Sequence, residues 1–147
     1  MKRIKSFIFA FALAAAFLGL QSCDDEKPIN PNELPNAAEQ FIKAHFADVA
    51  VSSVMKEWDD LSYRYDVYLS DGTAITFDKA GEWKDVENRI SGVPTTIIPE
   101  KINSYIATNY AGRFVVEIER GRQYDVELNN DLDLDFSLEG NFLRVDY

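Results

Sequence analysis

The amino-acid sequence matches itself when it is shifted by 64 residues. At that offset Leu34-Pro35 falls on Ile98-Pro99, and four further apolar positions coincide: Ala38 with Ile102, Phe41 with Tyr105, Ile42 with Ile106, and Phe46 with Tyr110. After a five-residue deletion the offset becomes 59, and it then aligns Tyr65 with Tyr124, Val67 with Val126, Phe77 with Phe136, Gly81 with Gly140, and Trp83 with Phe142. Self-similarity at a long period predicts one supersecondary unit encoded twice.

Each half opens with the pattern of a short amphipathic helix. Pro35 and Pro99 can occupy a first helical turn, where the missing N–H of proline has no partner in any case. The apolar residues after each proline recur at three- and four-residue spacing, which gives each helix one apolar stripe. Helices of about three turns are marginal alone, so we expect both to pack against other elements.

The apolar period then changes from about 3.6 to 2, which indicates strands. Alternation covers residues 63–69 and 75–77 in the first half, with an Asp71-Gly72 hairpin signal between them. The corresponding strands of the second half are 124–128 and 132–138. Further strands are expected around 51–58, 83–86, 114–119 and 142–145. The predicted fold class is α+β, a tandem repeat of one helix plus a four-stranded antiparallel sheet, with units at residues 34–92 and 93–147.

The N-terminal residues have the pattern of an export signal. A basic start is followed by an apolar run of 14 residues, 7–20, whereas a transmembrane helix needs about 20. The run ends in Leu20-Gln21-Ser22-Cys23, which resembles the lipobox of bacterial lipoproteins. We therefore expect a signal peptide at 1–22, a lipid anchor on Cys23 and an acidic, Pro/Asn-rich tether at 23–33. An ordinary signal peptide with an incidental cysteine is the alternative.

This pattern predicts a location in the cell envelope, as an outer-membrane lipoprotein on the periplasmic or the outer side. The chain has a formal net charge of −10 at pH 7. An acidic surface repels polyanions, so nucleic acid and anionic lipid surfaces are disfavoured as partners. Contact with the membrane is expected only through the lipid anchor.

Catalytic motifs are absent from the sequence. His45 is the only histidine, so it is the single candidate general base of that type. It lies near the end of the first predicted helix, where a polar side chain can bond helix-terminal carbonyls. No nucleophile-elbow or phosphate-binding glycine motif accompanies it. The sequence therefore predicts a protein that is not an enzyme and carries no cofactor.

Asp131, Asp133 and Asp135 are the candidate calcium ligands. Carboxylate oxygens suit Ca²⁺, but an EF-hand loop starting at Asp131 needs Gly at its sixth position and Glu at its twelfth, where Phe136 and Phe142 stand. On one strand, alternate carboxylates lie about 6.6–6.8 Å apart. A solvated acidic strand face is the competing interpretation.

The side chains predicted to face solvent suggest a binding surface instead. Aromatic and charged residues together are typical of protein interfaces. Trp83 aligns with Phe142 and is expected in the core. The candidate partner-binding residues are Tyr68, Arg64, Asp66, Trp58, Asp125 and Glu127.

These segments together resemble the PepSY-like family, whose fold is similar to that of the beta-lactamase inhibitor protein. The resemblance rests on LPNAAEQFIKAHF, YDVYLSDG, ITFDKAGEW, IPEKINSYIATNY, YDVEL and FSLEGNFLRVD, within residues 34–147. It implies an exposed sheet face that binds or inhibits a protein, such as an envelope peptidase or other hydrolase. A calcium-responsive sensor or ion-binding module remains the alternative function. Asn130-Asp131 departs from the pattern by replacing the Asp71-Gly72 turn.

Overall fold

The computed structural model describes residues 26–59 and 62–146. The first strands and helix are β1 (Lys27–Pro28), the 3-10 turn η1 (Pro31–Glu33), α1 (Asn36–His45), β2 (Val51–Asp59), β3 (Ser62–Leu69), β4 (Ala74–Asp78) and β5 (Trp83–Glu87). They are followed by α2 (Glu100–Asn109), β6 (Val115–Arg120), β7 (Tyr124–Leu128), β8 (Asp133–Phe136) and β9 (Phe142–Asp146). The predicted signal peptide and Cys23 lie outside the described residues.

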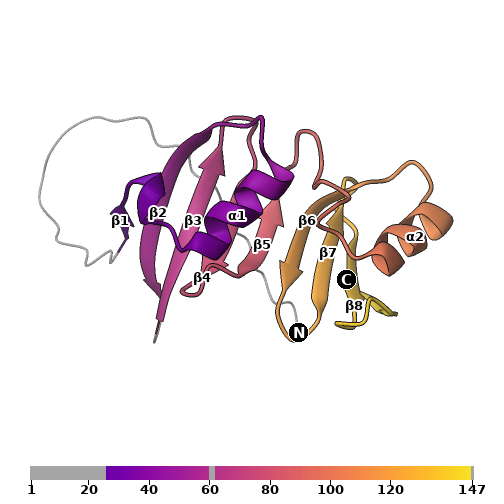
Figure 1. The fold of residues 1–147 in the computed structure, drawn as a ribbon. Helices are drawn as coiled ribbons and strands as arrows, with labels where there is room; N and C mark the ends of the chain where they lie inside the picture. The colour runs from indigo at the N-terminus through magenta and orange to yellow at the C-terminus, as the bar shows by residue number, and fades with distance from the viewer. Residues whose placement is uncertain (1–25, 60–61, 147) are drawn as a thin grey trace, which may run out of the picture.

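The strands of the described residues form one antiparallel sheet of nine, in the order β1 to β9 (Figure 1). The predicted tandem repeat of a helix plus a four-stranded sheet is therefore wrong. β5 pairs with β6, which places Val86 opposite Ile118 and merges the two expected sheets, while β1 adds a strand beside β2. An open sheet edge exposes unpaired N–H and C=O groups, and pairing β5 with β6 satisfies those groups on both strands.

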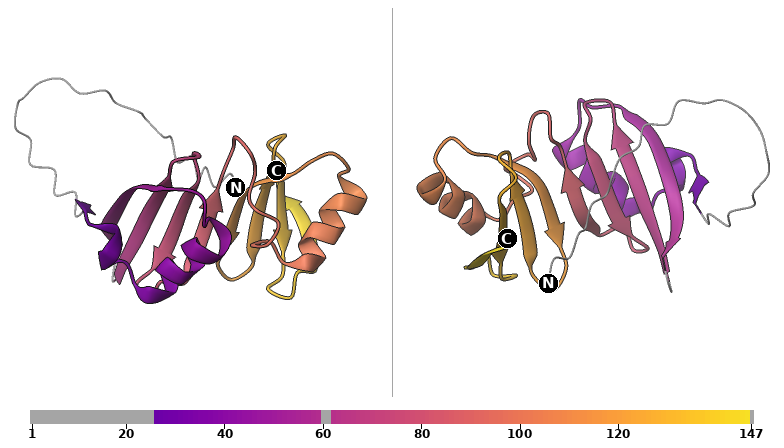
Figure 2. Two further views of the ribbon diagram at one scale, coloured as in Figure 1. Left: turned by 45° about the horizontal axis from the view of Figure 1, so that its top comes forward. Right: turned by 180° about the vertical axis from the view of Figure 1, so that it is seen from behind.

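Both helices lie on the same face of the sheet, α1 over its first strands and α2 over its last (Figures 1 and 2). The ring of Phe41 on α1 meets the ring of Phe77 on β4 edge to face at 5.6 Å. On α2, Tyr105 meets Phe136 of β8 in the same way at 5.4 Å. These contacts bury the apolar stripe of each helix against the apolar side of the strands.

Two glycines allow the helices to approach the sheet closely. Gly81 and Gly140, in the β4–β5 and β8–β9 turns, both have positive φ, +83° and +80°. A Cβ at Gly81 would lie 2.8 Å from the backbone nitrogen of Ala38, and one at Gly140 would lie 3.0 Å from Lys101 Cβ. The positive φ strains any other residue at both positions, and the close contacts leave little room for a Cβ, which explains why glycine stands there.

The core is continuous through the β5–β6 junction. Val86 and Ile118 are completely buried, and one contiguous cluster of buried residues extends from Leu34 to Phe136. Within the part of the chain that the structure describes, no helix is both long and apolar enough to cross a bilayer.

We predict that the sheet unfolds in a single transition. Ile118→Ala should lower the free energy of unfolding by about 2–5 kcal/mol, because it leaves a cavity in the centre of the shared core. Thermal or urea unfolding followed by circular dichroism measures this effect. Ile90→Ala is the control, since Ile90 is 78% exposed and its loss should cost no more than about 0.5 kcal/mol. Two separate transitions, one for each half, would contradict the single-sheet interpretation.

Candidate functional site: the open face of the sheet

No helix of residues 26–59 and 62–146 lies on the second face of the sheet (Figure 2). The strand pairing sets its outward side chains in two rows, which we call the open face. From β2 to β9 the first row is Met55, Asp66, Thr76, Asp85, Glu119, Asp125, Asp135 and Arg144. The second row is Ser53, Tyr68, Ala74, Glu87, Glu117, Glu127, Asp133 and Asp146.

The open face is strongly acidic. Ten of its sixteen side chains are carboxylates, and most of these lie directly opposite another carboxylate on the next strand. Opposite side chains in an antiparallel pair have Cβ atoms about 4.5–5.5 Å apart, and like charges at that distance repel. Positively charged groups are therefore stabilised at this face, and the chain itself supplies two arginines there.

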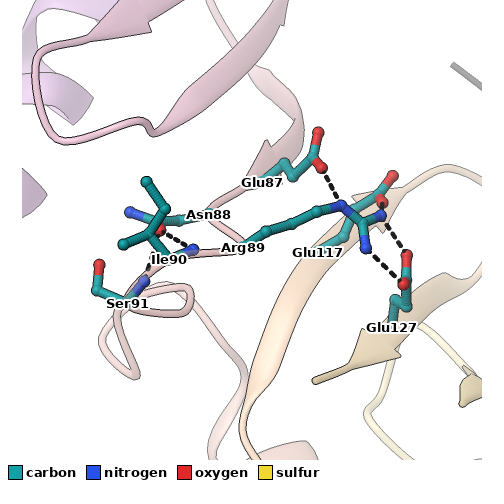
Figure 3. A network of polar contacts seen from close by, with 7 residues as sticks. All are labelled: Glu87, Asn88, Arg89, Ile90, Ser91, Glu117 and Glu127. Atoms are coloured by element: carbon teal, nitrogen blue, oxygen red, sulfur yellow. Dashed lines mark hydrogen bonds and ion pairs between the residues drawn. The ribbon is translucent and has the colours of Figure 1, made fainter. Parts of the chain in front are cut away.

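Arg89 is the main internal cation of this surface (Figure 3). It stands in the turn after β5, and its Nη1 and Nη2 donate to Glu127 Oε1 and Oε2 at 2.8 and 2.7 Å. Nη2 also lies 3.3 Å from Glu117 Oε2, and Nε donates to Glu87. One guanidinium thus connects carboxylates from β5, β6 and β7.

A buried asparagine holds the turn that carries Arg89. Asn88 is 1% exposed, and its Nδ2 donates to Thr73 Oγ1 at 2.8 Å. Its Oδ1 accepts from the backbone nitrogens of Ile90 and Ser91 at 3.0 and 2.8 Å (Figure 3). The turn is therefore tied to the β3–β4 connection, which positions Arg89 over the neighbouring strands.

Burial and mutual repulsion perturb the carboxylates at the β5–β6 junction. Burial, followed by the charges of Glu119 and Glu87, raises the pKa of Asp85 to about 7. Burial, followed by Asp85 and Glu87, raises the pKa of Glu117 to about 8. In contrast, hydrogen bonding to Arg89 lowers the pKa of Glu127. Near neutral pH this part of the face therefore holds protons that an approaching cation can displace.

A pocket of about 310 Å³ opens on the β6–β9 part of the face. Its lining is Glu117, Glu119, Gln123, Asp125, Val126, Glu127, Asp133, Asp135, Arg144 and Asp146. Asp135 is only 3% exposed, and its Oδ2 forms an ion pair with Arg144. Gln123 Nε2 donates to Asp125 Oδ1 at 2.6 Å. The pocket thus gathers carboxylates from all four strands of this region.

The structure brings most of the sequence-predicted binding residues onto one surface. Those on the open face are Asp66, Tyr68, Asp125 and Glu127, joined by Asp133 and Asp135 of the calcium candidates. Arg64 lies on the same side of β3 but beyond the two rows, opposite Glu57 and Asp78. Tyr68 is half-buried there, and burial raises the pKa of its hydroxyl.

Trp58 lies apart from this group. It shares a face with buried Val54, on the helix side of the sheet, and its ring packs edge to face with that of Tyr63 at 4.6 Å. Trp83 packs against the core, as its alignment with Phe142 predicts.

The remaining chemical candidates stay separate from one another. Asp131 stands in the β7–β8 turn with a φ of 60°, outside the two rows. In residues 26–59 and 62–146, no group of three or more His, Cys, Asp or Glu side chains is arranged to hold a metal ion. His45 lies within hydrogen-bond distance of Thr96, with 3.0 Å between Nδ1 and Oγ1, and burial lowers its pKa.

Sequence reasoning missed several residues of this surface, namely Asp85, Glu87, Glu117, Glu119 and Asp146, with the cations Arg89 and Arg144. Alternation of charged and apolar residues in Asp85 to Glu87 and in Glu117 to Glu119 is the signal that could have placed the strand residues. Arg89 stands in a turn, where the alternation of strand side chains gives no prediction of orientation.

The family model described as "Putative beta-lactamase-inhibitor-like, PepSY-like" matches residues 63–144. None of the curated proteins compared with the chain matches it. Among solved structures, a putative calcium-regulated periplasmic protein from Bacteroides thetaiotaomicron is similar, with a TM-score of 0.80 and 40% sequence identity. The match covers 84% of this chain and 98% of that one.

Two putative periplasmic proteins from Bacteroides vulgatus are also similar. One is 38% identical, with a TM-score of 0.79 over 86% of this chain and 100% of its own. The other is 36% identical, with a TM-score of 0.79 over 83% and 99%. The likeness therefore extends over almost the whole length of these relatives.

We predict that Asp85 and Glu117 make the protein less stable as the pH rises. Their folded-state pKa values are raised, so their contribution is complete below the unfolded values near pH 4 and is lost as the pH rises to about 8. With Asp85→Asn and Glu117→Gln together, the drop in unfolding free energy between pH 5 and pH 8 should shrink by on the order of 2 kcal/mol. Urea unfolding at both pH values measures it.

The matched control is Glu39→Gln, an exposed position on α1 away from the open face. It should retain the wild-type difference between the two pH values. An unchanged difference in the double variant would show that these two carboxylates are not the source of the pH dependence.

Proposed function

The chain belongs to the PepSY-like, beta-lactamase-inhibitor-like family, and from this membership we propose that it is a non-enzymatic binding protein of the cell envelope. The family membership predicted from the sequence motifs is confirmed by the family match and by the related structures. In this proposal the open face of the sheet binds, or inhibits, another protein. An envelope peptidase or other hydrolase is the partner class that the family resemblance favours.

The observation that carries the proposal is a sheet covered on one face only. The apolar face is used by α1 and α2, whereas no helix of the described residues covers the other (Figure 2). That second face joins outward side chains from β2 to β9 into one surface. Its tyrosine and arginines belong to residue types that protein interfaces favour, but its many carboxylates do not. Recognition therefore depends on a partner of complementary charge.

The surroundings of His45 support the non-enzymatic part of the proposal. Its ring nitrogen contacts Thr96, which is neither an activating carboxylate nor a strong nucleophile. General acid–base or nucleophilic catalysis needs the imidazole within reach of both a reacting group and an orienting one.

We extend the proposal to attachment at the outer membrane through a lipid on Cys23. The related structures are of putative periplasmic proteins, which agrees with export. The chain between Cys23 and β1 would then tether the sheet beside the membrane, because β1 itself pairs with β2. Its open face would meet envelope proteins and not cytoplasmic ones.

We predict that changes to the open face abolish partner capture. The full chain, purified in neutral detergent, serves as bait for chemical cross-linking in envelope extracts. A double variant, Tyr68→Ala with Asp125→Asn, removes one contact near each end of the face. The amount of cross-linked partner should fall at least about tenfold, because a few interface residues carry most of the binding energy.

Glu39→Gln on the exposed surface of α1 provides the control and should capture the partner as the wild type does. Equal capture by the double variant and the control would place the binding surface elsewhere.

Calcium binding is the second candidate function. A 40% identical relative is described as a putative calcium-regulated periplasmic protein, and the open face supplies the hard oxygen ligands that Ca²⁺ prefers. If this chain binds Ca²⁺ through its folded state, an ion concentration 100-fold above Kd should stabilise it by about 2.7 kcal/mol. Thermal melting with calcium chloride and with chelator measures this. An unchanged melting midpoint would remove this candidate.

A further inference from the structure

The open face already binds guanidinium groups that belong to the chain itself. The Arg89 side chain is 51% exposed, and it reaches Glu87, Glu117 and Glu127. The Arg144 side chain is 61% exposed, and it forms an ion pair with the buried carboxylate of Asp135. Arginine presents a planar fork of donors that matches carboxylates in pairs. The internal contacts of Arg89 and Arg144 therefore indicate that the geometry of this face suits a guanidinium group.

The pocket between β6 and β9 holds more negative charge than these arginines neutralise. Among the described residues that line it, seven are carboxylates and one, Arg144, is basic. Arg89 reaches Glu127 and Glu117 at one end of the pocket. The other acidic side chains include Asp125, Asp133 and Asp146, from β7, β8 and β9. A further cation can enter here at low cost because charge of the opposite sign already surrounds it.

The pKa values of the lining carboxylates agree with this deficit of positive charge. Burial and nearby acids raise the pKa of Glu117 to about 8. Burial, then the charge of Glu127, raises the pKa of Asp133. A bound cation would favour the ionised forms and reverse both shifts.

We propose that this pocket receives an arginine side chain from a basic segment of a protein partner, docked on the open face. The inference rests on the proposed function and specifies the chemistry of the partner. A volume of about 310 Å³ is at the lower end for pockets that hold small ligands, which suits one long side chain. Arg89, next to the pocket, is bound in the same way by carboxylates of adjacent strands (Figure 3).

A guanidinium fits the spacing of these carboxylates better than a calcium ion does. Ca²⁺ requires six to eight oxygens converging at about 2.3–2.6 Å, and no described group of three or more acidic side chains has a metal-binding arrangement. Carboxylates on neighbouring strands are separated by about 4.5–5.5 Å at Cβ. A flat, five-donor group can bridge that separation, as Arg89 does between Glu117 and Glu127.

The test uses a labelled peptide of three arginines separated by glycines, with the full chain in neutral detergent. A matched peptide has citrulline, the neutral isostere, in place of each arginine. Fluorescence anisotropy should show saturable binding of the arginine peptide, and binding of the citrulline peptide at least about tenfold weaker. Raising the salt from 50 to 500 mM should weaken the arginine complex, because added ions screen the attraction.

Matched variants locate the binding. Glu119→Gln with Asp133→Asn changes the pocket, whereas Glu39→Gln with Glu100→Gln makes the same change of charge on exposed positions of the two helices. Affinity for the arginine peptide should fall at least about tenfold in the pocket variant and less than about twofold in the helix variant. Circular dichroism and a single thermal transition confirm that each variant is folded.

Three results would overturn the inference: equal binding of both peptides, equal loss in both variants, or a melting shift with calcium chloride but none with the arginine peptide. The proposed function is judged separately, by cross-linking to an envelope partner. If that partner is captured through the open face while the arginine peptide fails to bind, the pocket inference fails and the proposed function stands.

Discussion

The structure depends on a sheet whose side chains are apolar on one face and charged on the other. Each strand turns alternate residues to opposite faces, so the residues that anchor α1 and α2 also determine where the carboxylates lie. Tyr65 and Val67 are buried in the core, and this forces Arg64, Asp66 and Tyr68 to the other side. The acidic surface is therefore a consequence of how the core packs.

The β5–β6 pairing is where stability and charge conflict most directly. It brings Val86 against Ile118 in the core, and on the opposite face it sets Asp85 against Glu119 and Glu87 against Glu117. Burying two aliphatic side chains contributes roughly 1.5–3 kcal/mol for each, and this offsets like-charge repulsion across the strand pair. Arg89 and protonation relieve what repulsion remains. The junction can therefore be both the centre of the core and the most perturbed part of the surface.

Much of the secondary structure could be predicted from sequence, but the way the strands assemble could not. Apolar periodicity located α1, α2 and the strands near Tyr65 and Tyr124, because these signals are local. Sheet continuity depends on whether β5 meets β6, and these strands are separated along the chain by α2. The outward orientation of Tyr68 and Asp125 could be predicted, since successive side chains of a strand point to opposite faces. Trp58 was predicted with them, but the structure sets it near the end of β2, on the face that it shares with Val54.

Excess carboxylates at fixed positions on a rigid sheet restrict the kind of ligand that can bind. An acidic composition alone does not. On a loop, carboxylates can converge on one small ion, whereas on strands their spacing is set by the backbone hydrogen bonds. A cation that matches such a surface must be extended and able to donate in several directions, which describes a guanidinium. Arg89 meets that requirement from within the chain, contacting three strands at once. The same geometry therefore neutralises the carboxylates around Arg89 and leaves the rest of the pocket suited to an arginine from outside.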